Sequence, residues 1–140
     1  MLDTRAHSYT IWRGGKPGYP VSERLPYYVW TKPSLVLINE KTVSNGEIFA
    51  HAYKTLGIGK LVGNKTQGSV ISTGTRTLRD GTRFTVPGRG WYRINDDMNL
   101  EGGGAIPDYC VYNPPYEDIQ PADEQLKRAV EILLDELKER

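Results

Sequence analysis

The amino-acid sequence predicts an α/β fold, on the strength of three patterns. A continuous apolar run at residues 35–38 is typical of a buried strand, and a helical pattern follows at residues 44–56. A second helical pattern with a regular apolar stripe covers residues 121–139. Short β-rich runs separated by Gly, Asn and Pro lie between the two helices. Such alternation indicates a sheet with helices packed on it, and 140 residues are enough for one domain.

Residues 1–33 are predicted to form an irregular N-terminal arm or linker. Aromatic and basic residues are mixed there with Gly and Pro, and neither a helical nor an alternating period survives. A structureless stretch of this length is unusual inside a compact domain. We therefore expect the arm to wrap against partners elsewhere, including chain upstream of this segment.

The first ordered unit is a strand, a turn and a helix. The run at residues 35–38 predicts a strand covered on both faces. Ser44 followed three residues later by Glu47 matches a capping box, so the helix is expected to begin at Ser44 and to end near Gly57. The predicted apolar face of this helix consists of Ile48, Phe49, Ala52, Tyr53 and Leu56.

Further strands are predicted in the second half. A short strand covers residues 60–63, and residues 69–78 and 82–87 form a hairpin whose turn is Arg79-Asp80-Gly81. Residues 88–105 are expected to be a Gly- and Asn-rich loop. A strand at residues 109–112 is expected to bury Cys110. The final helix is predicted to pack through Leu126, Ala129, Val130, Leu133, Leu134 and Leu137.

Composition and charge exclude several classes of function. Eighteen basic residues stand against 17 acidic ones, so the net charge of +1 gives no reason to expect nucleic acid as a partner. One cysteine and two histidines cannot form an intrachain disulfide and argue against a zinc site. No motif points to a cofactor, and no apolar stretch at the start predicts a signal peptide or a membrane span.

Ser44 has the local setting that nucleophilic serine chemistry uses. A rigid strand leads into a tight turn, and the serine stands at the mouth of a helix. The first amides of a helix, here those of Asn45 and Gly46, lack intrahelical acceptors and carry the positive end of the helix dipole. An acyl-transfer intermediate needs such donors for its oxyanion, and losing one costs about 3 kcal/mol of barrier. Gly46 would let a substrate approach the backbone closely.

The same pattern has a purely structural interpretation. Serine is among the commonest N-cap residues, so the local pattern is explained more simply by Ser44 as a cap of the helix. Local pattern alone leaves these two interpretations open.

Five blocks of the sequence, taken in chain order, resemble the tricorn and C-terminal processing peptidases. The blocks are residues 35–49, 56–68, 78–82, 106–108 and 123–126. The resemblance spans about residues 33–137. It implies a ClpP/crotonase-like sheet with packed helices. Residues 34–140 would form the C-terminal part of such a catalytic domain. Because only part of that domain is matched, we expect the domain in this chain to be incomplete.

The resemblance implies roles for three residues. Ser44 is the nucleophile, the amide of Asn45 is one oxyanion donor, and Glu101 supports the catalytic network. Tricorn-type members commonly have Asp after the serine, so Asn45 departs from that pattern and only its backbone role carries over. Without the resemblance, Glu101 would be interpreted as a solvated loop carboxylate.

The general base is not among the matched residues. Processing-type members place a lysine where this chain has Ser69, so the histidine-using tricorn branch is the better match; Lys65 would point to the other face of its strand. His51 lies two helical turns after Ser44, about 10 Å along the axis, and nothing around His7 singles it out. Gly14-Gly15 does not match the family's second oxyanion loop. We therefore expect the base and that loop to come from outside this segment.

Three hypotheses for function follow. The first is a serine endopeptidase acting on peptide or protein substrates, inactive as this isolated segment. The second is a non-catalytic peptide-binding or assembly module on a peptidase scaffold. The third, an acyl-CoA-handling member of the same broad fold, has no supporting motif. An incomplete core also predicts association with upstream chain or with further copies of the chain.

Overall fold

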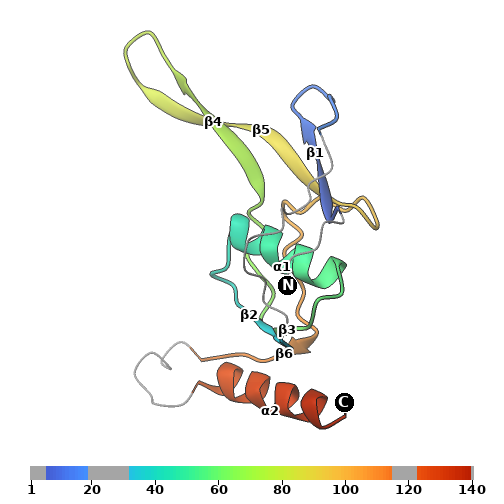
Figure 1. Cartoon of the computed structure of the whole chain (residues 1–140). Helices are drawn as coiled ribbons and strands as arrows, with labels where there is room; N and C mark the ends of the chain where they lie inside the picture. Colours follow the sequence, from blue (N-terminus) through green and yellow to red (C-terminus); the bar gives the residue numbers. More distant parts are fainter. Residues whose placement is uncertain (1–5, 19–31, 115–122, 140) are drawn as a thin grey trace.

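The computed structural model describes residues 6–18, 32–114 and 123–139, which form two three-stranded sheets and two helices (Figure 1). The elements in chain order are β1 (Ser8–Trp12), β2 (Val36–Ile38), α1 (Asn45–Thr55), β3 (Leu61–Gly63), β4 (Ile71–Thr77), β5 (Arg83–Arg93), β6 (Tyr109–Cys110) and α2 (Glu124–Lys138). The mixed α/β class predicted from the sequence is confirmed.

The smaller sheet is parallel and has the order β2-β3-β6. Its central strand, β3, is fully buried, and α1 and α2 lie on opposite sides of the sheet (Figure 1). Leu61 packs on the α1 side with Ile38, Ala50, Tyr53 and Ala105. Val62, the next residue, packs on the α2 side with Ala129 and Ile132. Alternation along one short strand therefore links two small cores.

Gly63 and Gln125 fix α2 against this sheet. Gly63 has φ +128°, and an added Cβ would collide with the Ile38 carbonyl and the Gln125 side chain. The buried Gln125 uses that space, because its Nε2 donates to the carbonyls of Ile38 at 3.1 Å and Val111 at 3.3 Å. Asp123 caps the helix by accepting the Leu126 N–H at 2.9 Å.

The larger sheet is antiparallel and has the order β1-β5-β4. The predicted hairpin is present, with the Leu78 N–H donating to the Thr82 carbonyl at 2.8 Å across the turn. Its far half projects away from the helices (Figure 1). The register shifts between Ser72 and Thr73, opposite Pro87, and this bulge lets the strand continue through a residue without an N–H.

Three expectations about strands were wrong. Residues 8–12 form a strand, β1, inside the stretch expected to be irregular, because Ser8 and Thr10 turn inward against β5 while Tyr9 faces outward. Residues 88–93 belong to β5 rather than to a loop. The bulge and the pairing with β1 explain this extension. In addition, Leu37 is exposed, so β2 is not covered on both faces.

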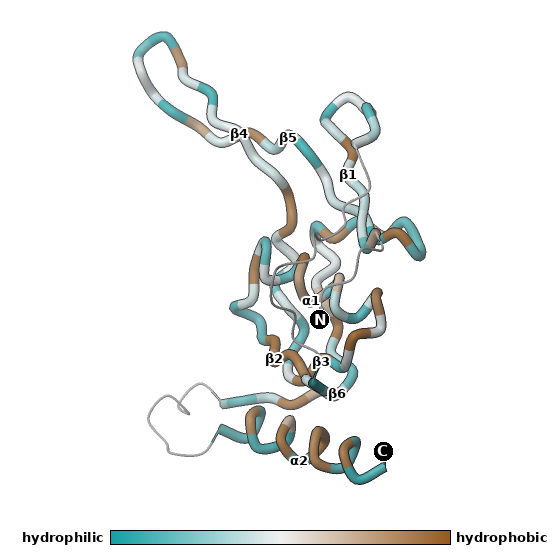
Figure 2. Tube along the Cα trace, in the orientation of Figure 1, coloured by the Kyte–Doolittle hydropathy of each residue, from teal (hydrophilic) through white to brown (hydrophobic). Residues whose placement is uncertain are grey.

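The buried faces of both helices differ from the predicted ones. Phe49 is exposed, and α1 instead buries Glu47, Ala50 and His51 beside the expected Ala52 and Tyr53. In α2 the buried residues are Gln125, Ala129 and Ile132, whereas four of the six predicted core residues are exposed: Leu126, Val130, Leu134 and Leu137. Figure 2 shows the resulting apolar colour along α2. Cys110 is also exposed, because β6 is a two-residue edge strand.

Among the described residues, none of the helices is long and apolar enough to cross a bilayer.

Candidate active site

Ser44 occupies an exposed turn between β2 and α1, in an unusual backbone conformation. A hydrogen bond from the Thr42 N–H to the Asn39 carbonyl, 2.9 Å, tightens the turn after β2. Ser44 has φ 54° and ψ −121°, and Asp97 is the only other non-glycine residue with positive φ in the described part of the chain. Residues held in sparsely populated conformations persist only where their surroundings enforce them, and they cluster at functional sites.

The buried carboxylate of Glu47 holds this turn in place. Glu47 has no exposed surface, although it lies only three residues after Ser44. Its Oε2 accepts the Thr66 hydroxyl at 2.6 Å and the Gly68 N–H at 2.7 Å. Its Oε1 accepts the Ser69 N–H at 2.8 Å and the Ser44 N–H at 3.2 Å. One side chain thus ties the start of α1 to the segment that follows β3.

Backbone hydrogen bonds reinforce the same junction. The Ser44 N–H donates to the Ser69 carbonyl at 3.0 Å, and the Gln67 N–H donates to the Thr42 carbonyl at 3.2 Å. Thr66 continues the network, since its hydroxyl oxygen accepts the Ala105 N–H at 2.6 Å. The conformation of Ser44 is therefore enforced from both its own helix and the neighbouring segment.

Ser44 is the N-cap residue of α1, but its hydroxyl is not committed to that role. Ser44 and Glu47 are arranged as a capping box. The Ser44 N–H donates to the Glu47 carboxylate at 3.2 Å, and the Ser44 side chain faces the Glu47 N–H without forming a cap hydrogen bond to it. The Glu47 N–H donates to the Ser44 carbonyl at 2.9 Å instead. An exposed hydroxyl on a fixed backbone is thus left for other chemistry.

Of the first two amides of α1, one already donates a hydrogen bond within the described chain and the other does not. The Gly46 N–H donates to the Val43 carbonyl at 3.1 Å, so it is not the open donor that the helix pattern predicted. The Asn45 N–H has no acceptor among the described residues, and Asn45 is exposed. The arrangement can therefore present one backbone donor beside Ser44 to an anionic oxygen.

Glu101 is hydrogen-bonded to the Ser69–Val70 segment that supports Ser44. Its Oε2 accepts the Val70 N–H at 2.6 Å, and its own N–H donates to the Asn99 side chain at 3.0 Å. Val70 follows Ser69, whose carbonyl accepts the Ser44 N–H. The structure thus brings Glu101 to the Ser69–Val70 backbone, one residue removed from the contact with Ser44.

The described histidines lie on other parts of the framework. His51 is buried in α1, where its Nε2 has no hydrogen-bond partner among the described residues. Burial, followed by the nearby positive charge of Arg93, lowers the pKa of His51 to about 4. His7 is buried next to β1, with its Nδ1 3.1 Å from the Ser8 hydroxyl.

Ser69, which the resemblance aligns with the lysine of processing-type members, contacts Ser44 through its backbone, because its carbonyl accepts the Ser44 N–H at 3.0 Å. The Ser69 hydroxyl accepts from the Gln67 side chain at 3.0 Å. Lys65 directly precedes the buried Thr66 in sequence, and its own side chain is exposed. Among the described residues, no group of three His, Cys, Asp or Glu side chains is arranged to hold a metal ion.

The role of Glu47 goes beyond the capping box that its spacing from Ser44 predicts. The available signal was the Thr66-x-Gly68 pattern after β3, which supplies the hydroxyl and the amide that the carboxylate accepts. The carboxylate of a capping box can accept hydrogen bonds both from the start of its own helix and from a neighbouring segment of this kind.

Comparison with known proteins identifies the family. The model of peptidase family S41 matches residues 3–111, which is more than half of the chain. The tricorn protease of Thermoplasma acidophilum is 33% identical over 105 residues, covering 74% of this chain and 10% of that protein. The chloroplastic carboxyl-terminal-processing peptidase 1 of Arabidopsis thaliana is 35% identical over 89 residues, covering 64% of this chain and 18% of that protein.

A solved structure agrees with this assignment. The crystal structure of the tricorn protease superposes with a TM-score of 0.69 at 32% identity, covering 76% of this chain and 10% of that one. The chain belongs to peptidase family S41, a family of serine peptidases. The matched region spans only a small part of the length of these relatives.

Proposed function

We propose that this chain supplies the nucleophile-bearing part of a serine endopeptidase active site, with Ser44 as the nucleophile. The observation that carries the proposal is the backbone of Ser44, held at φ 54° on an exposed turn by the buried Glu47 carboxylate. Strain of this kind has to be maintained by surrounding structure. A residue that served only as a helix cap would have no need of it.

The reaction would proceed by acyl transfer to the serine. The Ser44 oxygen attacks the scissile carbonyl of a peptide or protein substrate while a general base takes the hydroxyl proton. The Asn45 N–H donates to the oxyanion, and the absent side chain of Gly46 leaves room beside the attacked carbon. The base returns the proton to the leaving amine, and water then cleaves the acyl-enzyme by the same steps.

The base would come from outside the residues matched here. A base must lie within about 3 Å of the proton it takes, and the Nε2 of His51 is buried without a partner two turns along α1. Upstream chain, or another copy in a homo-oligomer, would supply it. Glu47 and Glu101 would act as positioning residues, through the Ser69–Val70 backbone that braces Ser44.

Chemical rescue tests this division of labour. We expect imidazole to accelerate hydrolysis of an activated ester by the chain, because a small base can occupy the space of a missing one. Ser44→Ala should abolish the imidazole-dependent rate, and Ser69→Ala is the matched control that removes a neighbouring hydroxyl. A fluorophosphonate probe read by intact mass gives an independent signal. An imidazole response that survives Ser44→Ala would refute the nucleophile assignment.

The second candidate is a non-catalytic peptide-binding or assembly module. It is favoured by Asn45, which departs from the family's usual acid, and by the lack of a described side chain hydrogen-bonded to the Ser44 hydroxyl. This candidate predicts that neither imidazole nor the probe distinguishes the wild-type chain from Ser44→Ala. The same two measurements therefore decide between the candidates.

A further inference from the structure

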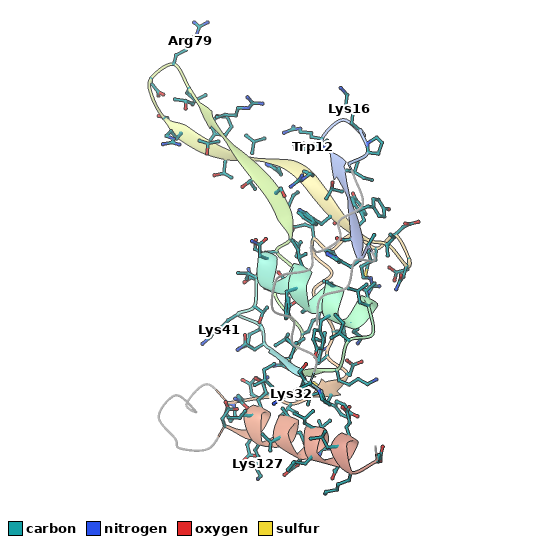
Figure 3. All side chains as sticks on the ribbon, in the orientation of Figure 1. Trp12, Lys16, Lys32, Lys41, Arg79 and Lys127 are labelled. Carbon is teal, nitrogen blue, oxygen red and sulfur yellow. The ribbon has the colours of Figure 1, made fainter. Side chains whose placement is uncertain are left out.

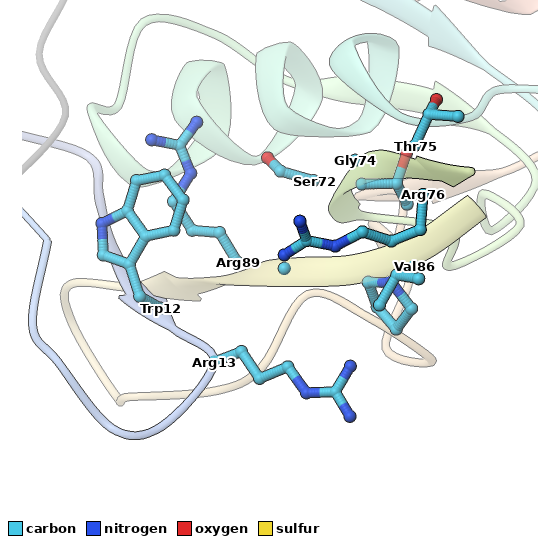
Figure 4. Close-up of a pocket in the computed structure, with 11 residues that line it drawn as sticks. Trp12, Arg13, Ser72, Gly74, Thr75, Arg76, Val86 and Arg89 are labelled. Carbon is cyan, nitrogen blue, oxygen red and sulfur yellow. The ribbon is translucent and has the colours of Figure 1, made fainter. Parts of the chain in front are cut away.

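A basic pocket lies between the end of β1 and the β4–β5 hairpin, separate from the turn that holds Ser44. Its volume is about 770 Å³, and Figure 4 shows its side chains. The residues that matter here are Trp12, Arg13, Arg76, Val86, Pro87 and Arg89. In the figure, Arg76 extends across β5 toward Trp12, above the apolar Val86.

The charges around this pocket are unbalanced. No acidic residue lines it, and none of Arg13, Arg76 and Arg89 forms an ion pair within the part of the chain that the structure describes. Residues 6–18 and 69–93 hold seven of the 18 basic residues and one of the 17 acidic ones, Asp80. The nearly neutral total charge thus conceals a positive sheet, which favours an anionic ligand.

Arg89 is held in an orientation suited to a carboxylate. Its guanidinium carbon lies 4.9 Å from the ring centre of Trp12 and 5.2 Å from that of Trp91. Trp91 is itself fixed by donating from its indole N–H to the Ser72 hydroxyl at 2.8 Å. A stacked guanidinium keeps its edge N–H groups for a planar, two-oxygen acceptor. The buried Arg89 Nε has no partner among the described residues.

The aromatic residues here favour a peptide over a nucleic acid. Single-stranded nucleic acids bind by stacking bases on open aromatic faces. Trp12 and Trp91 each have one ring face covered by the Arg89 guanidinium. Tyr9 and Tyr92 stack on each other, with ring centroids 5.3 Å apart. In addition, β4 is an edge strand of its sheet and follows directly on the Ser69–Val70 segment. An extended peptide beside Ser44 can therefore run along this sheet.

We propose that the pocket formed by Trp12, Arg13, Arg76 and Arg89 is an exosite for an acidic segment of the peptide substrate. This inference rests on the proposed function, because it assigns a preferred substrate class to the same enzyme. Asp or Glu side chains, several residues from the scissile bond, would pair with the guanidinium groups.

A binding assay that requires no catalysis tests the exosite. The Ser44→Ala chain is titrated into a fluorescein-labelled peptide containing six glutamates and into its all-glutamine counterpart, with anisotropy as the readout. We expect the acidic peptide to bind about tenfold more tightly or better, as guanidinium–carboxylate pairs are strong. Arg76→Gln should weaken its binding about tenfold, while leaving the glutamine peptide unchanged.

Arg79→Gln is the matched control. It removes the same charge from the same hairpin, but Arg79 lies at the tip, away from the pocket (Figure 3). Equal weakening by Arg76→Gln and Arg79→Gln would overturn the exosite, since only net charge would then matter. Tighter binding of a single-stranded oligothymidylate than of the acidic peptide would overturn it in favour of nucleic acid. Selective binding of the acidic peptide by a chain that fails the imidazole test would uphold the pocket and reject the peptidase.

Discussion

Of the two sheets in this molecule, the one with the shorter strands is the more deeply buried. The parallel sheet has strands of three, three and two residues, yet its central strand is entirely buried and it carries both hydrophobic clusters. The antiparallel sheet has strands of five, seven and eleven residues, and six of the seven residues of β4 are exposed. Burial, rather than strand length, therefore decides which sheet holds the fold together.

This difference suits the two proposed roles. A nucleophile must be fixed to within a fraction of an ångström, and Ser44 lies on the turn between β2 of the buried sheet and α1, where its N–H donates to the fully buried Glu47 carboxylate. A surface that collects charged segments of varied substrates needs accessible cations instead, and the exposed sheet supplies them.

The largest expected effect comes from Glu47. Glu47→Ala leaves the amides of Gly68 and Ser69 and the Thr66 hydroxyl without their acceptor in a buried site. We expect a loss of about 4 kcal/mol in the free energy of unfolding, measured by urea denaturation. Glu47→Gln, which keeps the shape and one acceptor oxygen, should lose about half as much. Equal stability of wild type and Glu47→Ala would mean that the turn is not held by this carboxylate.

One substitution made in both regions tests the comparison directly. Leu61 is fully buried in the parallel sheet, whereas Leu78 is 52% exposed beside the hairpin turn. Leu61→Ala should cost about 3 kcal/mol, through lost burial and a cavity. Leu78→Ala should change the unfolding free energy by less than about 0.5 kcal/mol. Chemical denaturation of the two variants gives the answer, and similar losses would show that the exposed sheet contributes to the core after all.

The elements of the site region could be predicted from sequence because their signals are local. The apolar run before Ser44, the capping pair of Ser44 and Glu47, and the turn residues Arg79-Asp80-Gly81 each specify their own element. The family resemblance was likewise carried by contiguous blocks, and it was confirmed. Nearly all strands and both helices were accordingly expected at about their observed positions.

Long-range pairing could not be predicted in the same way. Strand β1 forms because residues about 80 positions later present a partner edge, and the segment alone contains too much Gly and Pro around it to indicate a strand. The same limit applies to α2, where a regular apolar stripe predicted a core, but of its six residues only Ala129 is buried, beside Gln125 and Ile132 from outside the stripe. Which face of an amphipathic helix is covered depends on neighbours, and four stripe residues are exposed in the described structure.

A third prediction uses pH to separate the regions. The folded state lowers the pKa of His51 to about 4, mainly by burial and then by Arg93, against the opposing charges of Glu47 and Asp96. In the unfolded chain His51 therefore binds a proton below pH 6.5, whereas in the folded chain it does so only below about pH 4. Stability should fall as pH drops through this window and be unaffected above it. The full shift corresponds to about 3 kcal/mol, and we expect about 2 kcal/mol because the ring is only partly screened from solvent. Denaturation of wild type and His51→Gln at pH 7.5 and 4.5 measures it; an equal drop in both would exclude His51.

The smallest expected effect lies on the surface of the buried region. Lys54 of α1 donates to the Ile106 carbonyl at 2.9 Å and pairs with Asp108 at 3.0 Å, but its side chain is 42% exposed. Burial works to raise the pKa of Asp108, yet the Leu61 N–H and the Lys54 charge outweigh it and leave that pKa lowered. Lys54→Met keeps the aliphatic stem and should cost less than about 1 kcal/mol, as exposed pairs do. The difference in unfolding free energy between wild type and Lys54→Met should shrink further in about 1 M NaCl, because salt screens exposed charges. A loss above about 2 kcal/mol in urea denaturation would mean that polar contacts, and not only burial, set this region apart from the exposed sheet.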